Sequence, residues 1–459
     1  MLIIEHYICV YTQTRSMSLS DMSNKITNIQ EDYATKPVPK NKRRSAFGTL
    51  VVWAGWTISV TGLIVGGTIG AGLPLRAAIP AILLGNLVLA VVGSLNGYIG
   101  MKTGLSTYML AQSLFGKSGS VIISVFIGIM AMGFVGVFAG LTGGFINSQI
   151  ASIPAIVGAL AFTVLVVLTA IHGFRGLETL SKIAVPALWV FAIVGLLAVG
   201  SQVTGGLTGI FNISPSGASL TIAGAMTLAI ATWIAGATIT ADIGRYAQNR
   251  DHVLLGAFGG WLAGAAFLEC IAAALALGVG DGNLVVVMGS MGSLFAIVAF
   301  LVFVLAMWTS GDNNLYSFSL AFASLSNVVG GSLKNVTKEQ WVIVGGVIVF
   351  LLAALGIYGQ FIPFLLLIAI TVPPVAGIFI SHFYVLGNIN KKVKAGAKGI
   401  NTTAFASWIL ASGFGYLSVP GTFPGQGQIS IAALASVPLP ITTLVLAIVL
   451  YAVLTRVTA

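Results

Sequence analysis

The residues best suited to binding chemistry in this chain of 459 residues are two neighbouring hydroxyls inside a long apolar stretch, Thr309 and Ser310. They follow Ala306 at spacings of three and four, so a helix would bring the Ala306 carbonyl and both hydroxyls to one face. Sodium prefers oxygen ligands, and carbonyls freed by a break in a second helix would complete its shell. The spacing therefore indicates a sodium site, against the alternative that such hydroxyls bond back to their own helix.

The helices that must hold these residues span a membrane. Hydrophobic residues make up 57% of the chain and charged residues 7%, with a mean hydropathy of +1.02, whereas a soluble surface needs many more charged side chains. A helix crosses the hydrocarbon with about 20 apolar residues. Twelve stretches meet that length and predict an all-α polytopic membrane protein: 47–73, 77–101, 119–148, 153–172, 180–200, 219–241, 254–279, 288–310, 341–358, 361–387, 403–421 and 433–455.

Lysine and arginine mark every second connection between these spans. All 21 lie in the N-terminal arm or at the ends of alternate spans, with the sole exception of Arg76. Basic loops resist translocation, so the pattern predicts a multi-pass plasma-membrane protein with both termini in the cytoplasm. Residues 1–45 are too polar to bury a core and are predicted to form a flexible cytoplasmic arm. The net charge of +10 is spread over short loops, so we expect no nucleic-acid partner.

Glycines make the first and sixth predicted spans candidates for broken helices. The first contains a run of them around Gly66, and the sixth contains Gly236 within the segment 231–238. Discontinuous helices at matching positions of two inverted repeats free backbone carbonyls at the bilayer midplane, where they can bind ions and substrate. The two spans are five apart, as two five-span repeats require. Close packing of helices through small residues is the alternative reading.

Two acids lie at or near membrane depth, where an ionisable group is costly and by default signals function. Glu269 falls near the middle of the seventh predicted span, and could couple protons or serve as a hydrogen-bonded structural acid, with the structural role favoured. Asp312 follows Ser310 by two residues, and could tune the ion site or organise Asn313 and Tyr316.

Enzymatic chemistry has little support in the sequence. Intramembrane proteolysis would need two facing aspartates, a serine with its base, or a zinc site, and the two acids stand in unrelated contexts. The sequence contains no glycine-rich phosphate-binding loop that ends in Gly-Lys-Ser or Gly-Lys-Thr. It therefore gives no sign of an ATP-driven pump. We expect neither an enzyme nor a cofactor, only a sodium ion or a proton as coupling ion.

Three sets of motifs resemble a known family. In matching order and spacing over about residues 45–385, the chain is similar to the nucleobase:cation symporters, and specifically to their bacterial cytosine and purine permease branch. The motifs are Gly66-Gly67-Thr68-Ile69-Gly70-Ala71-Gly72-Leu73 with Gly85-Asn86 and the segment 97–107, then Thr240-Ala241-Asp242-Ile243-Gly244-Arg245-Tyr246, then Trp308-Thr309-Ser310-Gly311-Asp312-Asn313-Asn314-Leu315-Tyr316.

The resemblance implies a leucine-transporter-type fold. Ten core helices in two inverted five-helix repeats would occupy residues 46–387, with the first and sixth helices broken, and two peripheral helices would occupy residues 388–459. It also implies a secondary active transporter, a monomeric cation symporter that imports a nucleobase or a similar planar heterocycle such as cytosine or a purine. A symporter of the same fold for an amino acid or another small metabolite is the alternative.

Carried over by position, the family's sodium site would fall on the carbonyls of Gly55, Ile58 and Ala306 and the hydroxyls of Thr309 and Ser310. This assignment agrees with the argument from oxygen ligands made above.

The family's two aromatic rings, which hold a flat heterocycle between them, would be Phe134 and Trp233. Stacking plus a few hydrogen bonds at the edge suits a nucleobase. Two positions that carry an amide side chain in relatives are Ala131 and Phe138 here. The polar contacts must therefore differ, and the candidates are Ser59, Thr232 and Asn314.

Overall fold

The computed structural model describes residues 37–172, 177–329, 331–393, 396, 398–419, 426–428 and 431–458. Across these ranges the structure is helical, and the only strand-like pairing in them is a single bridge between Arg44 and Ala247. Most of the predicted N-terminal arm, residues 1–36, lies outside the described residues.

Many of the predicted spans form helices long enough to cross a membrane. Among the described residues six qualify alone, and eight do if each of two bent helix pairs counts as one span. This confirms a multi-pass helical membrane protein. The six are α5 (Leu75–Thr103), α7 (Lys117–Gln149), the series α13 (Arg250–Phe258), η4 (Gly259–Ala265) and α14 (Ala266–Val279), α16 (Ser293–Val329), the series α18 (Phe361–Thr371), α19 (Pro373–Ile380) and η6 (Ser381–Val385), and α21 (Leu439–Thr458).

Shorter helices complete the described part of the chain. One bent pair is α3 (Ala46–Thr57) with α4 (Val60–Gly72), and the other joins Pro186–Gln202 of α9 to Gly206–Asn212 at an angle of 82°. The other helices are α6 (Thr107–Phe115), α8 (Ala155–His172), α9 (Leu177–Gln202), α10 (Gly206–Gly209), α11 (Ile222–Thr238), α12 (Ala241–Gly244), α15 (Leu284–Ser290), α17 (Lys338–Ala354) and α20 (Thr402–Ser418), with single turns η2 (Lys40–Lys42), η3 (Ile210–Asn212), η5 (Gly331–Asn335) and η7 (Ala432–Leu434).

The predicted break in the first span is confirmed. Helix α3 ends at Thr57, Ile58 and Ser59 are extended, and α4 starts at Val60 after a bend of 58°. A helix end leaves its last carbonyls without intrahelical partners. Among the described residues, no backbone N–H donates to the carbonyl of Gly55 or Ile58 across this break.

The predicted break in the sixth span is misplaced. Helix α11 runs without interruption past Gly236 to Thr238, and the chain then turns at Ile239 and Thr240 into the four-residue helix α12. Gly236 is a packing residue, because a Cβ there would lie 3.1 Å from the ring of Trp56. Close packing, the alternative reading of these glycines, therefore holds at Gly236.

Side chains from other helices determine where α11 ends. Asn96 on α5 donates through Nδ2 to the Ala237 carbonyl at 3.2 Å, and Thr107 at the start of α6 donates to the Ile239 carbonyl at 3.1 Å. These donors stand in for the intrahelical N–H groups that the turn removes.

The eighth span is longer than predicted. It was expected to end at residue 310, but α16 continues to Val329. The polar run that resembles an exit from the membrane is stabilised by neighbouring helices: Trp308 donates through Nε1 to Thr169 on α8 at 3.0 Å, and Asp312 lies close to Thr169 and to Lys338 at the start of α17. The residues after Ser310 therefore stay helical, and Gly311, Asp312, Leu315, Phe318 and Ser319 among them are buried.

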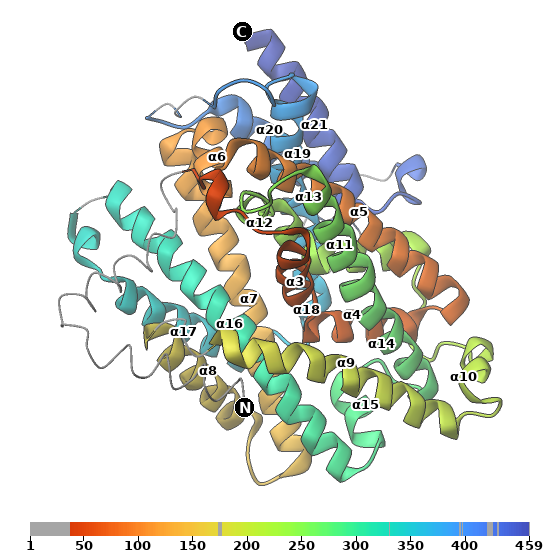
Figure 1. Cartoon of the computed structure of the whole chain (residues 1–459). Helices are drawn as coiled ribbons and strands as arrows, with labels where there is room; N and C mark the ends of the chain where they lie inside the picture. The colour runs from red at the N-terminus through yellow and green to blue at the C-terminus, as the bar shows by residue number, and fades with distance from the viewer. Residues whose placement is uncertain are drawn as a thin grey trace, which may run out of the picture.

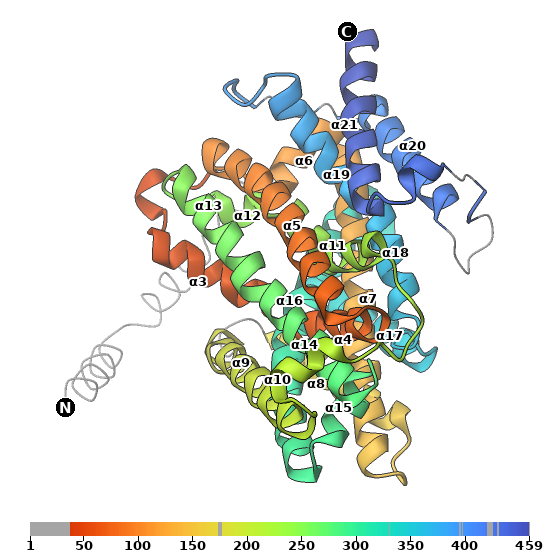
Figure 2. The same ribbon diagram turned by 90° about the vertical axis from the view of Figure 1, so that its right-hand side faces the viewer.

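Helix packing brings distant parts of the chain together. Helix α4 packs along α14, α11 along α5, and α7 crosses α16 near the middle of the molecule (Figure 1). Glycines permit the first contact, since a Cβ on Gly66 would lie 2.2 Å from the Glu269 carbonyl oxygen and one on Gly70 would lie 2.2 Å from that of Ala273. Helices α20 and α21 pack on α19 at one end of the molecule (Figure 2).

Candidate substrate and cation site

A cavity of about 170 Å³ lies beside the break of the first span. Helices α3, α7, α11 and α16 and the first turn of α4 form its walls. The residues predicted to contact substrate come from four separate parts of the chain, and all of them line this cavity: Ser59, Phe134, Thr232, Trp233 and Asn314.

Aromatic neighbours hold the two predicted stacking rings in place. The Trp233 ring meets Trp56 edge to face, with centroids 6.0 Å apart and planes at 66°. Phe134 makes similar contacts with Phe361 and Phe364 on α18, at 6.3 and 5.3 Å. Such pairs are worth about 0.5–1.5 kcal/mol beyond their buried area, so each ring is held in its orientation before anything binds.

Hydroxyl and amide groups supply the polar part of the wall. Ser59 and Thr61 hydrogen-bond each other at the start of α4, and Thr232 donates to the Leu228 carbonyl of its own helix at 2.9 Å. The amides of Asn313 and Asn314 line the cavity and form no hydrogen bond to any described residue. Both amides are therefore available to the edge of a ligand.

Among the lining residues that the sequence did not predict, three carry a hydroxyl, an amide or an indole: Trp56, Thr61 and Asn313. Helical spacing could have identified Asn313, because it follows Thr309 by four residues and Ser310 by three. Trp56 carries no such signal, since its place in the wall depends on the angle between α3 and α4.

The predicted sodium ligands gather at the same break, though not all at its surface. Gly55, Thr309 and Ser310 line the cavity, whereas Ile58 and Ala306 are buried next to it. Thr309 donates its proton to the Ala306 carbonyl at 2.9 Å. Its oxygen can therefore still offer lone pairs to a cation. The sodium assignment itself stays a prediction.

Neither predicted coupling acid lines the cavity. Glu269 is fully buried on α14 against Gly62 and Gly66 of α4, and Asn86 on α5 donates through Nδ2 to its Oε2 at 2.7 Å. Its other oxygen has no partner among the described residues. This contact ties α14 to α5 beside α4, away from the cavity.

Asp312 faces α8 and α17 rather than the ion ligands. It is 1% exposed and lies close to Thr169 and Lys338. The ammonium of Lys338 stands 3.8 Å from the centroid of the Tyr316 ring. Asp312 therefore belongs to a polar contact between helices α8, α16 and α17.

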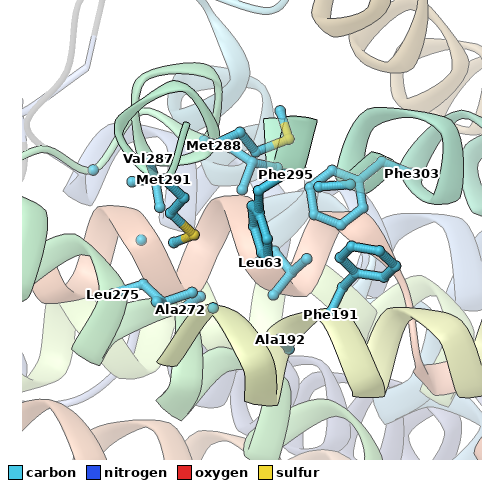
Figure 3. Close-up of a pocket in the computed structure, with 15 residues that line it drawn as sticks. Leu63, Phe191, Ala192, Ala272, Leu275, Val287, Met288, Met291, Phe295 and Phe303 are labelled. Atoms are coloured by element: carbon cyan, nitrogen blue, oxygen red, sulfur yellow. The ribbon is translucent and has the colours of Figure 1, made fainter. Parts of the chain in front are cut away.

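A second cavity, of about 30 Å³, lies between α4, α9, α14, α15 and α16 (Figure 3). Its labelled side chains carry only carbon and sulfur and include Leu63, Phe191, Met288 and Phe303. A polar heterocycle needs hydrogen-bond partners where it is desolvated. This apolar void is therefore no match for such a ligand.

Comparison with known proteins identifies the family. Residues 37–435 match the model of a family described as permease for cytosine/purines, uracil, thiamine, allantoin. The cytosine permease of Escherichia coli strain K12 is 32% identical over 362 residues, which cover 77% of this chain and 81% of that protein. The chain belongs to this permease family. It is a transporter and not an enzyme.

Solved structures share the fold of the permease. The inward-facing conformation of Mhp1 superposes with a TM-score of 0.75 at 18% identity, covering 92% of each chain. Mhp1 described as a nucleobase-cation-symport-1 family transporter, closed with bromovinylhydantoin bound, gives 0.71 at 18% identity, with 93% and 95% covered. A Na⁺-coupled sialic acid symporter gives 0.64 at 15% identity, with 94% and 91% covered.

Proposed function

We propose that the permease is a secondary active transporter that imports a nucleobase or a similar planar heterocycle, such as cytosine or a purine, together with a cation. The observation that carries the proposal is the cavity at the helix break, where two aromatic rings, Phe134 and Trp233, share a wall with the amides of Asn313 and Asn314. A nucleobase has a π face and a polar rim, and this wall offers partners for both.

Sodium is the coupling ion that the site favours. Thr309 and Ser310 line the same cavity as Gly55, and the carbonyls of Gly55 and Ile58 stand at the unwound end of α3. Five neutral oxygens, completed by Ala306, suit a hard monovalent cation.

Charge argues against the alternative cargo. An amino acid brings a carboxylate and an ammonium group, and buried charges need partners. The described residues that line the cavity include no Asp, Glu, Lys, Arg or His. A neutral heterocycle fits this lining better than a zwitterion does.

The exposed residues of the cavity wall indicate the side of the membrane to which the cavity opens. Gly55 on α3 and Asn313 on α16 are exposed, and a Cβ on Gly55 would meet no heavy atom within 4 Å. The cavity therefore opens on the side of α3, the half of the broken span that follows the N-terminal arm. We assign this state as open to the cytoplasm.

The twelve-span topology, with both termini inside, is part of the proposal. Contacts between ends predicted to lie inside support it. Arg43, before the first predicted span, donates to the Met101 carbonyl at the end of the second, and Ser118, at the start of the third, donates to the Lys398 carbonyl before the eleventh. The inverted repeat is supported by reciprocal packing: α4 lies on α14 of the seventh span, and α11 of the sixth lies on α5 of the second. We retain residues 46–387 as the core and 388–459 as two peripheral helices.

The test is a binding competition on detergent-purified permease. A ligand that binds only the native state raises its apparent stability. Cytosine, adenine, hypoxanthine and leucine should be compared with and without sodium. We expect at least one base, and not leucine, to raise the melting temperature, and to do so more in sodium. Stabilisation by leucine alone would refute the proposed cargo.

A further inference from the structure

Trp56 occupies a position that joins the cation ligands to the stacking wall. It lies in the last turn of α3, directly after Gly55 and two residues before Ile58, whose carbonyls are the proposed cation ligands. The hinge at Ile58 and Ser59 separates this turn from α4 by 58°. Any movement of the two carbonyls toward α16 therefore moves Trp56 as well.

The ring of Trp56 is seated on α11. A Cβ on Gly236 would lie 3.1 Å from Cη2 and 3.3 Å from Cζ2 of Trp56, which is closer than most Cβ contacts. Gly236 follows Trp233 by three residues, so the two positions share one face of the helix. The Trp56 indole therefore packs on the backbone of Gly236, with the Trp233 ring beside it.

The contact between the Trp56 and Trp233 indoles leaves the two rings little freedom to move. Their centroids are 6.0 Å apart with planes at 66°, and both rings line the cavity. A flat ligand stacked on Trp233 must border the Trp56 ring or displace it. The position of α3 and the stacking of the ligand are therefore sterically linked.

We propose that Trp56 couples cation binding to substrate binding. The cation draws the carbonyls of Gly55 and Ile58 toward the hydroxyls of α16, α3 turns about its hinge, and Trp56 takes the position that closes the stacking site on Trp233. This inference rests on the proposed function. It makes Trp56 a positioning residue, since it shapes the stacking site through its contact with Trp233.

The experiment measures the dissociation constant of the base, cytosine or whichever of the tested bases binds, with and without sodium. The ratio of the two constants reports the coupling, which is typically 5- to 150-fold between linked sites. Trp56→Ala should reduce the ratio to below about twofold, and Trp56→Phe should give an intermediate value. Sodium binding in the absence of base should persist in both, because none of its ligands is removed.

Two further variants separate coupling from folding. Trp53→Phe alters an indole of the same helix that is fully buried against Trp261, 6.2 Å away, and does not line the cavity. It should keep the unaltered ratio. Gly236→Ala keeps the Trp56 ring but places a Cβ 3.1 Å from it, so that the ring must shift, and it should lower the ratio as well.

Three outcomes would overturn the proposal. One is an unaltered ratio in Trp56→Ala, which leaves the proposed function intact. Another is a complete loss of base binding in folded Trp56→Ala, which would make Trp56 a direct substrate ligand. The third is base binding by the unaltered permease that ignores sodium, which would refute both the coupling and the sodium assignment but not base recognition.

Discussion

Replacing Trp233 by alanine removes the ring on which the substrate is proposed to stack. Stacking of a base on an aromatic side chain is worth about 1–3 kcal/mol, and each 1.4 kcal/mol is a factor of ten in affinity. The variant should therefore bind the base roughly 5- to 140-fold more weakly. The edge-to-face contact with Trp56 is also lost, which should lower the stability of the permease by about 0.5–1.5 kcal/mol in addition to lost burial.

The assay is equilibrium binding of a labelled base to detergent-purified protein in sodium buffer, with thermal unfolding measured in parallel. Trp189→Ala is the matched control, because Trp189 is stacked on Phe267 at 4.5 Å and does not line the cavity. It should lose stability and keep its affinity. If Trp233→Ala binds within about twofold of the unaltered protein, the ring is not part of the substrate site.

Three other substitutions test separate parts of the account. Thr309→Ala combined with Ser310→Ala should abolish the sodium stimulation of base binding at unchanged expression; sodium dependence that survives would exclude these ligands. Glu269→Gln should leave both sodium and pH dependence of uptake unaltered, since an amide still accepts from Asn86; a lost pH dependence would reveal a proton role. Gly66→Ala should destabilise the permease by at least about 1–3 kcal/mol in thermal unfolding, because its Cβ meets the Glu269 backbone at 2.2 Å; a melting temperature equal to that of the unaltered protein would contradict this packing.

Local spacing predicted the parts of the site that lie on a single helix. Thr309, Ser310 and Ala306 share a face of α16 because residues three and four apart always do. The glycine-rich first span is broken as predicted, since α3 and α4 part at Ile58, but the glycine run around Gly66 lies inside α4 and packs on α14. Motif resemblance, and not periodicity, singled out Phe134 and Trp233.

Contacts between distant segments were beyond the reach of the sequence. The end of α11 depends on Asn96 and Thr107, which lie more than a hundred residues earlier and donate to its last carbonyls. The partner of Glu269 is Asn86, at a separation of 183 residues. Trp56 enters the cavity only because α3 is bent at the hinge. In each case tertiary packing decides between local alternatives that the sequence leaves open.

Uptake into proteoliposomes tests the central claim most directly. The purified permease should be reconstituted, and labelled cytosine, adenine and hypoxanthine should be supplied with an inward sodium gradient or with potassium in its place. The proposed mechanism predicts that at least one base accumulates above its external concentration in sodium and only equilibrates in potassium. Failure of every base to accumulate, with protein that is folded and oriented, would contradict cation-coupled import of a nucleobase.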